Sequence, residues 1–496
     1  MTMRKFENAV QLLKYKVLKE VALLAIEGTL EENQRLIPKQ VNPGMKATTH
    51  CCIHKEHAIL KERVTLAMGG DKGNPNIIEV IGIACDECPV NRFTITEACR
   101  GCLAHHCSDA CPFGAIYHIG QRAYIDPKRC KECGKCKAVC PYNAVSEVMR
   151  PCIRTCGANA LSINEDKKAV IDNDECIQCG ACVYQCPFGA IMDKSYIVEI
   201  IKLLQQAEQD LDIRVYAVMA PAISSQFTYA KIGQVVSGIK GLGFHDVVEA
   251  ALGADMIAVH EAQEFAETIE KRKVMTTSCC PAFVTYIEKK YPELTHHISH
   301  SISPMIATGR LIKSTDPKAK VVFIGPCTAK KREAHEEDIK DAVDYVMTFE
   351  ELQAMLDAAE IEVADCEDSH LDNASFYGRI FARAGGVTEA IKHVIEELEI
   401  DAELKPIPCD GLAECDRALK ILNAGRSLGN FIEGMACVNG CIGGAASLCH
   451  GPKDKNEVDK YGALATEKNI SESLRIFNLD KINFERRGQP VNMVVH

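Results

Sequence analysis

Cysteine is the residue type whose number and spacing could do chemistry in this chain. There are 27 cysteines in 496 residues, and sixteen of them lie between Cys85 and Cys186. Residues 130–142 read CKECGKCKAVCPY and residues 99–114 read CRGCLAHHCSDACPFG. Closely spaced cysteines that end in Cys-Pro bind [4Fe–4S] clusters through their thiolates, whereas zinc sites usually show isolated pairs. The spacing therefore favours iron–sulfur clusters over zinc.

Both runs resemble those of two-cluster bacterial ferredoxins, in which the fourth cysteine of each run binds the other run's cluster. This rule predicts a first quartet of Cys99, Cys102, Cys107 and Cys140, and a second of Cys130, Cys133, Cys136 and Cys111. CIQCGACVYQCPFGAI (176–191) and PCIRTCGANAL (151–161) predict a third of Cys176, Cys179, Cys182 and Cys156. The remaining cysteines form a fourth quartet by count alone: Cys85, Cys88, Cys152 and Cys186. Four such clusters would carry single electrons between the surface and a buried site.

The second half of the chain has the pattern of an α/β domain. RVYAVMAPAI (214–223), RKVMTTSCC (272–280) and KVVFIGPC (320–327) are apolar runs that end at small or reactive residues. FEELQAMLDAAE (349–360) and AIKHVIEELE (390–399) have helical periodicity. Alternating strands and helices predict a parallel sheet covered by helices, with the chemistry at strand ends.

The expected fold class is therefore a multidomain α+β and α/β protein, with ferredoxin-like cluster domains ahead of a large α/β domain. The expected segments are a helical N-terminal segment of unknown role (1–80), a two-cluster domain (81–148), a second cluster domain (149–197), the large domain (198–450) and a polar tail packed on it (451–496). HCCIHKEH (50–57) has adjacent cysteines but no second ligand pair at a clean spacing, so a metal site is the less favoured interpretation there.

Composition narrows the function and the compartment. The formal net charge is -11 and no basic stripe is present, which argues against a nucleic-acid binder. The N-terminal residues carry scattered charges, unlike a signal peptide, and no stretch has eighteen uninterrupted apolar residues. We therefore expect a cytoplasmic protein without a membrane span, in which disulfides are rare and thiols bind metal.

Three segments of the second half resemble the three signature motifs of [FeFe]-hydrogenases, in the same order. They are TTSCCPAFV (276–284), FIGPCTAKKREA (323–334) and EGMACVNGCIGG (433–444), and the resemblance covers roughly residues 205–450. It implies reversible interconversion of protons and electrons with H2, exchanged with ferredoxin or a similar one-electron carrier. It also implies an H-cluster, which is a [4Fe–4S] cubane joined to a diiron subsite bearing CO, cyanide and a bridging dithiolate made by separate maturation proteins.

The same resemblance implies roles for individual residues. The cubane ligands would be Cys280, Cys327, Cys437 and Cys441, with Cys441 bridging to the diiron subsite. Cys279 would be the proton-donating thiol, and protons would reach it through Glu264, Ser299 and Glu261. Lys330 would hydrogen-bond a cyanide ligand, and Pro221, Phe381 and Met435 would wall the subsite. Each of these roles has a structural alternative. Cys279 could be an inert buried cysteine, the two glutamates could lie on a solvated helix face, and Lys330 could be a surface lysine. The three wall residues could be ordinary core residues.

Several positions depart from the family pattern. CVNGC stands where CPGGC is usual, Phe283 replaces a tryptophan, Gly325 a methionine and Met305 a glutamine. These changes alter the surroundings of the subsite while keeping the ligands and the relay, as in the divergent clade called group B. Two other functions stay open: a hydrogen sensor of low turnover, and an iron–sulfur assembly-type protein without the diiron subsite.

Overall fold

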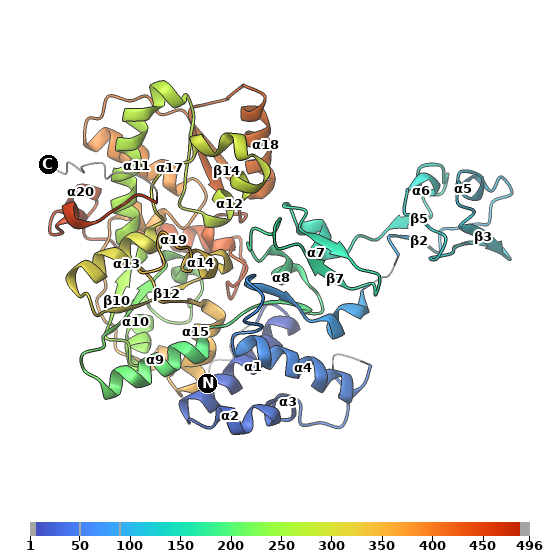
Figure 1. Cartoon of the computed structure of the whole chain (residues 1–496), viewed down its shortest axis with the longest axis horizontal. Coiled ribbons are helices and arrows are strands. Elements are labelled where there is room, and N and C mark those ends of the chain that lie inside the picture. The colour runs from blue at the N-terminus through green and yellow to red at the C-terminus, as the bar shows by residue number, and fades with distance from the viewer. Residues whose placement is uncertain (1–5, 49–50, 89–90, 487–496) are drawn as a thin grey trace.

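The computed structural model describes residues 6–48, 51–88 and 91–486. Figure 1 shows a large body that contains the second half of the chain, with the N-terminal helices packed along one side. A small domain lies against this body, and a second small domain projects away from it. No helix in the described part of the chain is both long and apolar enough to cross a membrane.

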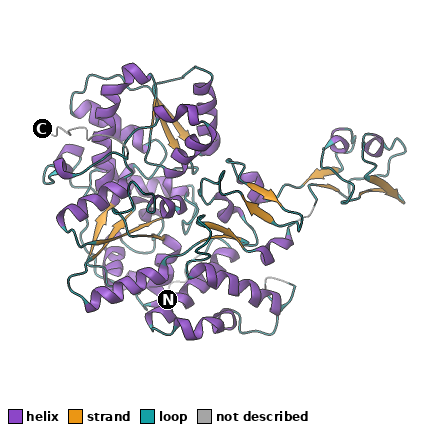
Figure 2. Ribbon diagram, in the orientation of Figure 1, coloured by secondary structure: helices purple, strands orange, loops and turns teal. Residues whose placement is uncertain are grey.

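The large domain contains two parallel sheets. The first has the order β10-β9-β12-β13 and consists of β9 (Val215–Met219), β10 (Asp246–Glu249), β12 (Lys320–Gly325) and β13 (Tyr345–Thr348). The second has the order β11-β15-β14 and consists of β11 (Met275–Thr276), β14 (Pro406–Asp410) and β15 (Phe431–Met435). The three apolar runs of the sequence form β9, β11 and β12, so the predicted parallel α/β arrangement is confirmed (Figure 2).

Helices cover both sheets. The two segments with helical periodicity form α15 (Phe349–Ala358) and α17 (Gly386–Glu397), as predicted. The long helix α11 (Ala250–Arg272) is buried on all sides from Ala250 to Ala262, so it runs through the interior of the domain. The other helices are α9 (Ile197–Gln209), α10 (Ile232–Gly241), α12 (Pro281–Lys290), α13 (Pro304–Thr315), α14 (Thr328–Glu333), α16 (Phe376–Ile380) and α18 (Leu412–Asn423).

The two small domains are built from short antiparallel hairpins. The near domain pairs β1 (Ile78–Val80) with β8 (Ile191–Asp193) and β6 (Leu161–Ile163) with β7 (Ala169–Ile171), and contains η2 (Gly82–Glu87), α7 (Pro151–Thr155) and α8 (Ala181–Gln185). The distal domain pairs β2 (Phe93–Ile95) with β5 (Val145–Glu147) and β3 (Ile116–Ile119) with β4 (Arg122–Ile125), around α5 (His106–Asp109) and α6 (Lys135–Ala138). Because β1 pairs with β8, the expected boundary after residue 80 falls inside the near domain.

The N-terminal segment is helical, with α1 (Ala9–Ile26), α2 (Leu30–Asn33), η1 (Gln34–Leu36), α3 (Ile37–Val41) and α4 (Ile53–Ala67). Val17, Leu18 and Val21 of α1 are buried in the same apolar core as the large domain. Lys14 Nζ lies 2.6 Å from Asp193 of the near domain and 2.5 Å from Glu350 of α15. The N-terminal segment therefore joins the near domain to the large domain.

The last described residues return to the large domain. They form α19 (Asp454–Ala463), α20 (Ile470–Leu474) and η7 (Leu479–Lys481). Glu485 then makes a β-bridge with Ser301, whose carbonyl oxygen accepts a hydrogen bond from Ser278 Oγ of the 276–284 motif.

Candidate catalytic and iron–sulfur sites

A cavity of about 80 Å³ lies where the strands of the large domain end. Pro221 follows β9, Cys279 and Cys280 follow β11, and Cys327 follows β12. Since the carboxyl ends of parallel strands meet at one edge of a sheet, these residues converge. The expected site residues that line the cavity are Pro221, Cys279, Cys280, Cys327, Lys330, Phe381, Met435 and Cys441.

Cys280, Cys327, Cys437 and Cys441, here called the cubane quartet, lie close enough to influence one another. Burial, followed by the nearby Cys280, raises the pKa of Cys327 to about 11. Burial likewise raises the pKa of Cys441 to about 12, with contributions from Cys327 and Cys280. The pKa of Cys437 is raised by burial and then by the same two thiols. Four crowded buried thiols that oppose one another's ionisation suit a metal cluster, because metal binding deprotonates its ligands.

The two adjacent cysteines face different neighbours. Cys280 is the N-cap residue of α12 and influences Cys327, whereas the first charged neighbour of Cys279 is Glu261. Burial, followed by the Glu261 carboxylate, raises the pKa of Cys279 well above its usual value. Cys279 is therefore a neutral thiol at physiological pH, and it lines the cavity.

The expected relay residues lie in a row behind Cys279. Glu261 Oε1 accepts hydrogen bonds from Ser278 N and Ser278 Oγ, both at 3.3 Å. Ser299 Oγ donates to Glu264 Oε2 at 2.7 Å and lies near enough to Glu261 to influence its pKa. Burial, followed by the charge of Glu264, raises the pKa of Glu261 to about 8. Glu261 Oε2 is buried and has no hydrogen-bond partner among the described residues.

The outer end of this row reaches solvent. Arg272 Nη1 lies 3.0 Å from Glu264 Oε1, and the backbone N–H of His300 donates to the same oxygen at 3.0 Å. The His300 side chain is half exposed and contacts Arg272 Nη2 through its ring at 2.9 Å. The row thus approaches the surface at His300, while Glu264 itself is buried.

Lys330 enters the cavity from α14 and is held from behind. Its Nζ donates to the Cys279 carbonyl oxygen at 3.3 Å and to Glu333 Oε2 at 2.7 Å. Ser303 Oγ donates to the same Glu333 oxygen at 3.0 Å, and Arg486 binds the other Glu333 oxygen. The buried ammonium therefore has one buried carboxylate partner while it lines the cavity.

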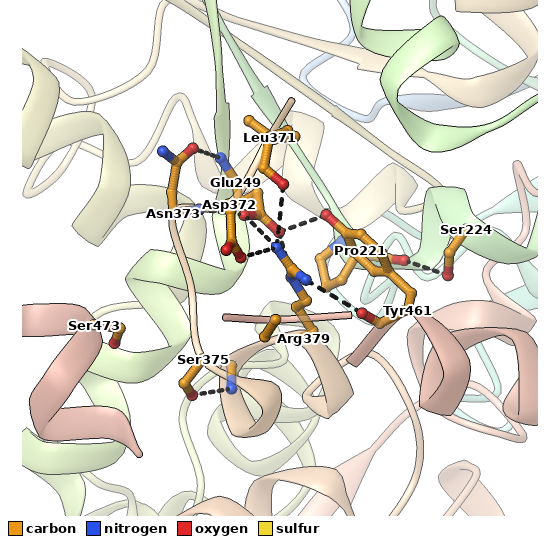
Figure 3. Close-up of polar contacts among 12 residues, drawn as sticks. Pro221, Ser224, Glu249, Leu371, Asp372, Asn373, Ser375, Arg379, Tyr461 and Ser473 are labelled. Carbon is orange, nitrogen blue, oxygen red and sulfur yellow. Dashed lines mark hydrogen bonds and ion pairs between the residues drawn. The ribbon is translucent and has the colours of Figure 1, made fainter. Parts of the chain in front are cut away.

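Polar contacts also fix the walls of the cavity. Ser224 Oγ donates to the Pro221 carbonyl oxygen at 2.9 Å, which closes the turn after β9 (Figure 3). Arg379 forms ion pairs with Glu249 at 2.7 Å and with Asp372 at 2.8 Å, in the same region of the molecule. Arg379 stands two residues before Phe381, so these buried ion pairs anchor the end of α16 that presents Phe381 to the cavity.

Sequence reasoning missed Ser278, Arg272, Glu333 and Arg486. Ser278 precedes the cysteine pair and Glu333 stands three residues after Lys330 on a helix, so local spacing could have indicated both. The positions of Arg272 and Arg486 depend on how distant segments pack, and no local pattern marks them.

The structure brings together the members of each accessory quartet. The second quartet lines one small cavity and the third lines another. In the first quartet, Cys107 interacts with Cys102 and Cys140, and Cys99 packs in the same apolar cluster. In the fourth, burial raises the pKa of Cys152 to about 11, with contributions from Cys186, Cys85 and Cys88.

The quartets follow one another toward the large domain. Cys182 of the third quartet interacts with Cys152 of the fourth, and Cys179 of the third interacts with Cys280 of the cubane quartet. Within the described chain, no three His, Cys, Asp or Glu side chains converge as a single metal ion would require. The second and third quartets each surround a small cavity instead. Cys51 and Cys52 are exposed, and His50 lies outside the described residues.

Comparison with known proteins gives the family. The family model for the iron-only hydrogenase large subunit, C-terminal domain, matches residues 213–445. Two 4Fe-4S dicluster models match residues 122–187 and 98–144. Iron hydrogenase 1 of Clostridium pasteurianum is 31% identical over 387 residues, which cover 68% of this chain and 66% of that protein. This chain therefore spans about two thirds of the length of that relative.

Two further comparisons bear on fold and function. A cytosolic Fe-S cluster assembly factor of Danio rerio is 25% identical over 269 residues, covering 43% of this chain and 66% of that protein. The structure of an apo [FeFe]-hydrogenase variant from Chlamydomonas reinhardtii matches with a TM-score of 0.50 and 19% identity, over 60% of this chain and 96% of that one. The signature motifs, the cluster domains and these similarities together establish that the chain belongs to the iron-only hydrogenase large subunit family.

Proposed function

We propose that this protein is a hydrogenase that interconverts two protons and two electrons with H2. The observation that carries the proposal is one cavity lined by the Cys279 thiol, the Lys330 ammonium and three thiols of the cubane quartet. A buried row of acids and hydroxyls runs from that cavity to the surface. The reduction of protons needs protons and electrons to arrive at one site from which water is excluded. The row of acids and hydroxyls would supply the protons, and a cluster on the cubane quartet would supply the electrons.

The cubane quartet would hold the [4Fe–4S] part of an H-cluster, with Cys441 shared with the diiron subsite. When bound, this group supplies the redox chemistry by which the H–H bond forms or breaks. Lys330 would offset the charge of a cyanide ligand, since a cation in a low-dielectric pocket stabilises an adjacent anion strongly. Pro221, Phe381 and Met435 would exclude water, and maturation proteins would deliver the diiron subsite.

Protons would pass through residues of this chain. Glu264 exchanges protons with solvent beside Arg272, and Ser299 Oγ connects Glu264 to Glu261. Glu261 holds a proton at neutral pH because its pKa is about 8, and it recharges the Cys279 thiol. A proton carrier whose pKa lies near the working pH transfers protons efficiently in both directions.

Electrons would travel along the accessory clusters. The electrostatic interactions among the quartets support the order fourth quartet, third quartet and cubane quartet. The distal domain lies beyond the near domain, so its two quartets would come first (Figure 1). A ferredoxin or a similar one-electron carrier would exchange electrons at the distal end.

The similarity to cytosolic Fe-S cluster assembly factors favours a second candidate, an assembly-type protein that never holds the diiron subsite. Hydrogen evolution distinguishes the two. Anaerobically purified full-length protein, loaded with the diiron subsite, should produce H2 from a reduced dye and show infrared bands of CO and cyanide. Cys441→Ser should lose both signals. A filled cubane without these bands or H2 would favour the assembly-type protein, and bands without turnover would favour a sensor.

A further inference from the structure

Arg63, in α4 of the N-terminal segment, is a buried cation beside the fourth quartet. Only 1% of its surface is exposed, and it ranks among the largest fully buried side chains of the protein. Its Nη2 donates to the Phe188 carbonyl oxygen at 3.0 Å, and its Nη1 contacts the Met192 sulfur at 3.1 Å. Both partners follow Cys186 closely in sequence, so the guanidinium lies over the turn that presents this ligand.

The backbone of this turn is shaped around the guanidinium. Gly189 has a φ of +55°, and a methyl group there would fall 2.7 Å from Arg63 Nη2. The backbone N–H of Ala190 donates to Cys186 Sγ at 3.2 Å. The turn thus directs its N–H at the Cys186 sulfur, and its glycine leaves room for the guanidinium.

Within the described part of the chain, Arg63 lacks the carboxylate partners that two other buried cations, Lys14 and Lys331, have. Lys14 and Lys331 are each bound by two carboxylates. Among the described residues, Arg63 contacts a carbonyl oxygen and a thioether, and Nε has no hydrogen-bond partner. The Cys186 thiol is near enough to interact with the guanidinium electrostatically. A buried cation without an anion is costly, so a negative charge is expected nearby.

A thiolate-bound cluster would supply that charge. Ile59 and Leu66 of the same helix, with Ile78 and Ile81, surround the fourth quartet with apolar atoms, and charges interact strongly in such surroundings. Arg150, 5% exposed, approaches from another direction, with Nη1 3.7 Å from Cys85 Sγ. Cluster reduction potentials respond to charge, hydrogen bonds and solvent exposure.

We propose that Arg63 is the buried counter-cation of a [4Fe–4S] cluster on the fourth quartet, and that it raises the reduction potential of this cluster. The inference rests on the cluster assignment in the proposed function, but it does not need the diiron subsite. Adding an electron makes an already negative cluster more negative, and a fixed cation favours that step. Arg63 would therefore favour an electron at the junction between the distal domain and the near domain, which gives the N-terminal segment a part in electron transfer.

The test is a redox titration followed by EPR on the full-length protein with its accessory clusters assembled. Cys152→Ala first identifies the couple of the fourth quartet by its loss. Arg63→Gln should make reduction of that couple at least tenfold less favourable, about 59 mV for a one-electron couple. The other couples should not move. Lys61→Gln removes an exposed charge from the same helix and should move none. Arg63→Lys, which keeps the charge, should retain most of the potential.

Each outcome decides the matter. An unchanged couple in Arg63→Gln overturns the proposal, as does an equal shift in the Gln and Lys variants, which would indicate packing rather than charge. If Arg63→Gln loses the iron of this cluster, retention in Arg63→Lys supports the counter-cation, and loss in both overturns it. If wild-type protein lacks the iron of one cluster and Cys152→Ala removes no redox couple, the assignment of a cluster to the fourth quartet is itself overturned.

Discussion

At the scale of single residues, the roles proposed for Cys279 and Cys280 differ because the two side chains have different neighbours. Cys280 starts α12 and faces Cys327, while Cys279 ends the preceding loop and faces Glu261. One cysteine can then bind a metal while the other stays protonated in a dry environment. Burial raises the pKa of the Cys279 thiol and of the Glu261 carboxyl group, so each of these two groups holds a proton at neutral pH.

Glu261→Gln should lower hydrogen/deuterium exchange about 10²- to 10⁴-fold, the usual contribution of a positioned acid or base. In the wild type, exchange should fall as the pH rises above about 8, because Glu261 then loses its proton. Glu270→Gln, an exposed change on the same helix, is the control. Equal exchange rates in Glu261→Gln and wild type would remove Glu261 from the relay.

The same substitution should stabilise the fold at neutral pH. The pKa of Glu261 rises from 4.5 when unfolded to about 8 when folded, so folding takes up a proton at pH 7. This uptake costs stability at every pH above 4.5, and glutamine avoids it. Denaturant unfolding should show Glu261→Gln more stable at pH 7 by up to about 3 kcal/mol, with the gain vanishing toward pH 4. A less stable variant at pH 7 would contradict a protonated Glu261.

At the scale of elements, β15 and α12 touch at a position that departs from the family pattern. The ring of Phe283, which is fully buried, lies against Gly434 of β15. A methyl group on Gly434 would fall 2.1 Å from the ring, so glycine is required where the aromatic ring meets the strand. The ring in turn supports the strand that ends at Met435.

Gly434→Ala should therefore destabilise the protein by about 1–3 kcal/mol, as overpacking of a dense core does. Thermal and denaturant unfolding measure this change. Gly44→Ala, where the nearest atom lies at 3.4 Å, should be close to neutral. If both alanine variants unfold at the wild-type midpoint, Phe283 does not press on this strand.

The C-terminal residues act on the cavity through Glu333. Arg486 binds Glu333, which binds Lys330. In Arg486→Gln, Lys330 should remain as the main cation of Glu333, and the Lys330 ammonium should be drawn away from the cavity. H2 evolution should then fall about tenfold, the usual effect of losing a residue that supports a metal ligand from behind. The cyanide infrared bands should shift as well. Arg475→Gln, on an exposed residue of the same region, should change neither signal. Unshifted bands in Arg486→Gln would show that the C-terminal residues do not act on Lys330.

At the scale of the whole molecule, the distal domain differs in charge from the rest. Residues 91–148 contain eight Lys or Arg and five Asp or Glu, in a chain whose formal net charge is -11. Large apolar side chains are also exposed there, among them Leu103, Tyr117 and Ile119. A domain with excess positive charge and exposed apolar residues, which would hold two of the proposed clusters, suits an acidic one-electron carrier.

Electron transfer from an acidic carrier should therefore slow as salt concentration rises, because steering between exposed charges is screened. Lys128→Glu with Lys131→Glu should lower the association rate at low salt about tenfold or more. Lys453→Glu with Lys455→Glu, an equal change on the large domain, should have little effect. Stopped-flow mixing measures these rates, and equal slowing by both double variants would place entry elsewhere.

Local patterns in the sequence predicted much of this molecule. Cysteine spacing grouped thiols that lie together in space, and apolar runs located β9, β11 and β12, because both signals are local. Arg63, Arg486 and the pairing of β1 with β8 could not be predicted. They depend on contacts between segments more than a hundred residues apart, and the charge balance of a buried site is known only once its neighbours are packed.

The measurement that tests the central claim most directly is hydrogen/deuterium exchange by the full-length protein loaded with the diiron subsite, with infrared spectra from the same sample. Wild type should show CO and cyanide bands and rapid exchange, while Cys279→Ala should keep the bands and lose nearly all exchange. Bands without exchange in the wild type, or unchanged exchange in Cys279→Ala, would contradict a hydrogenase that uses this thiol as its proton donor.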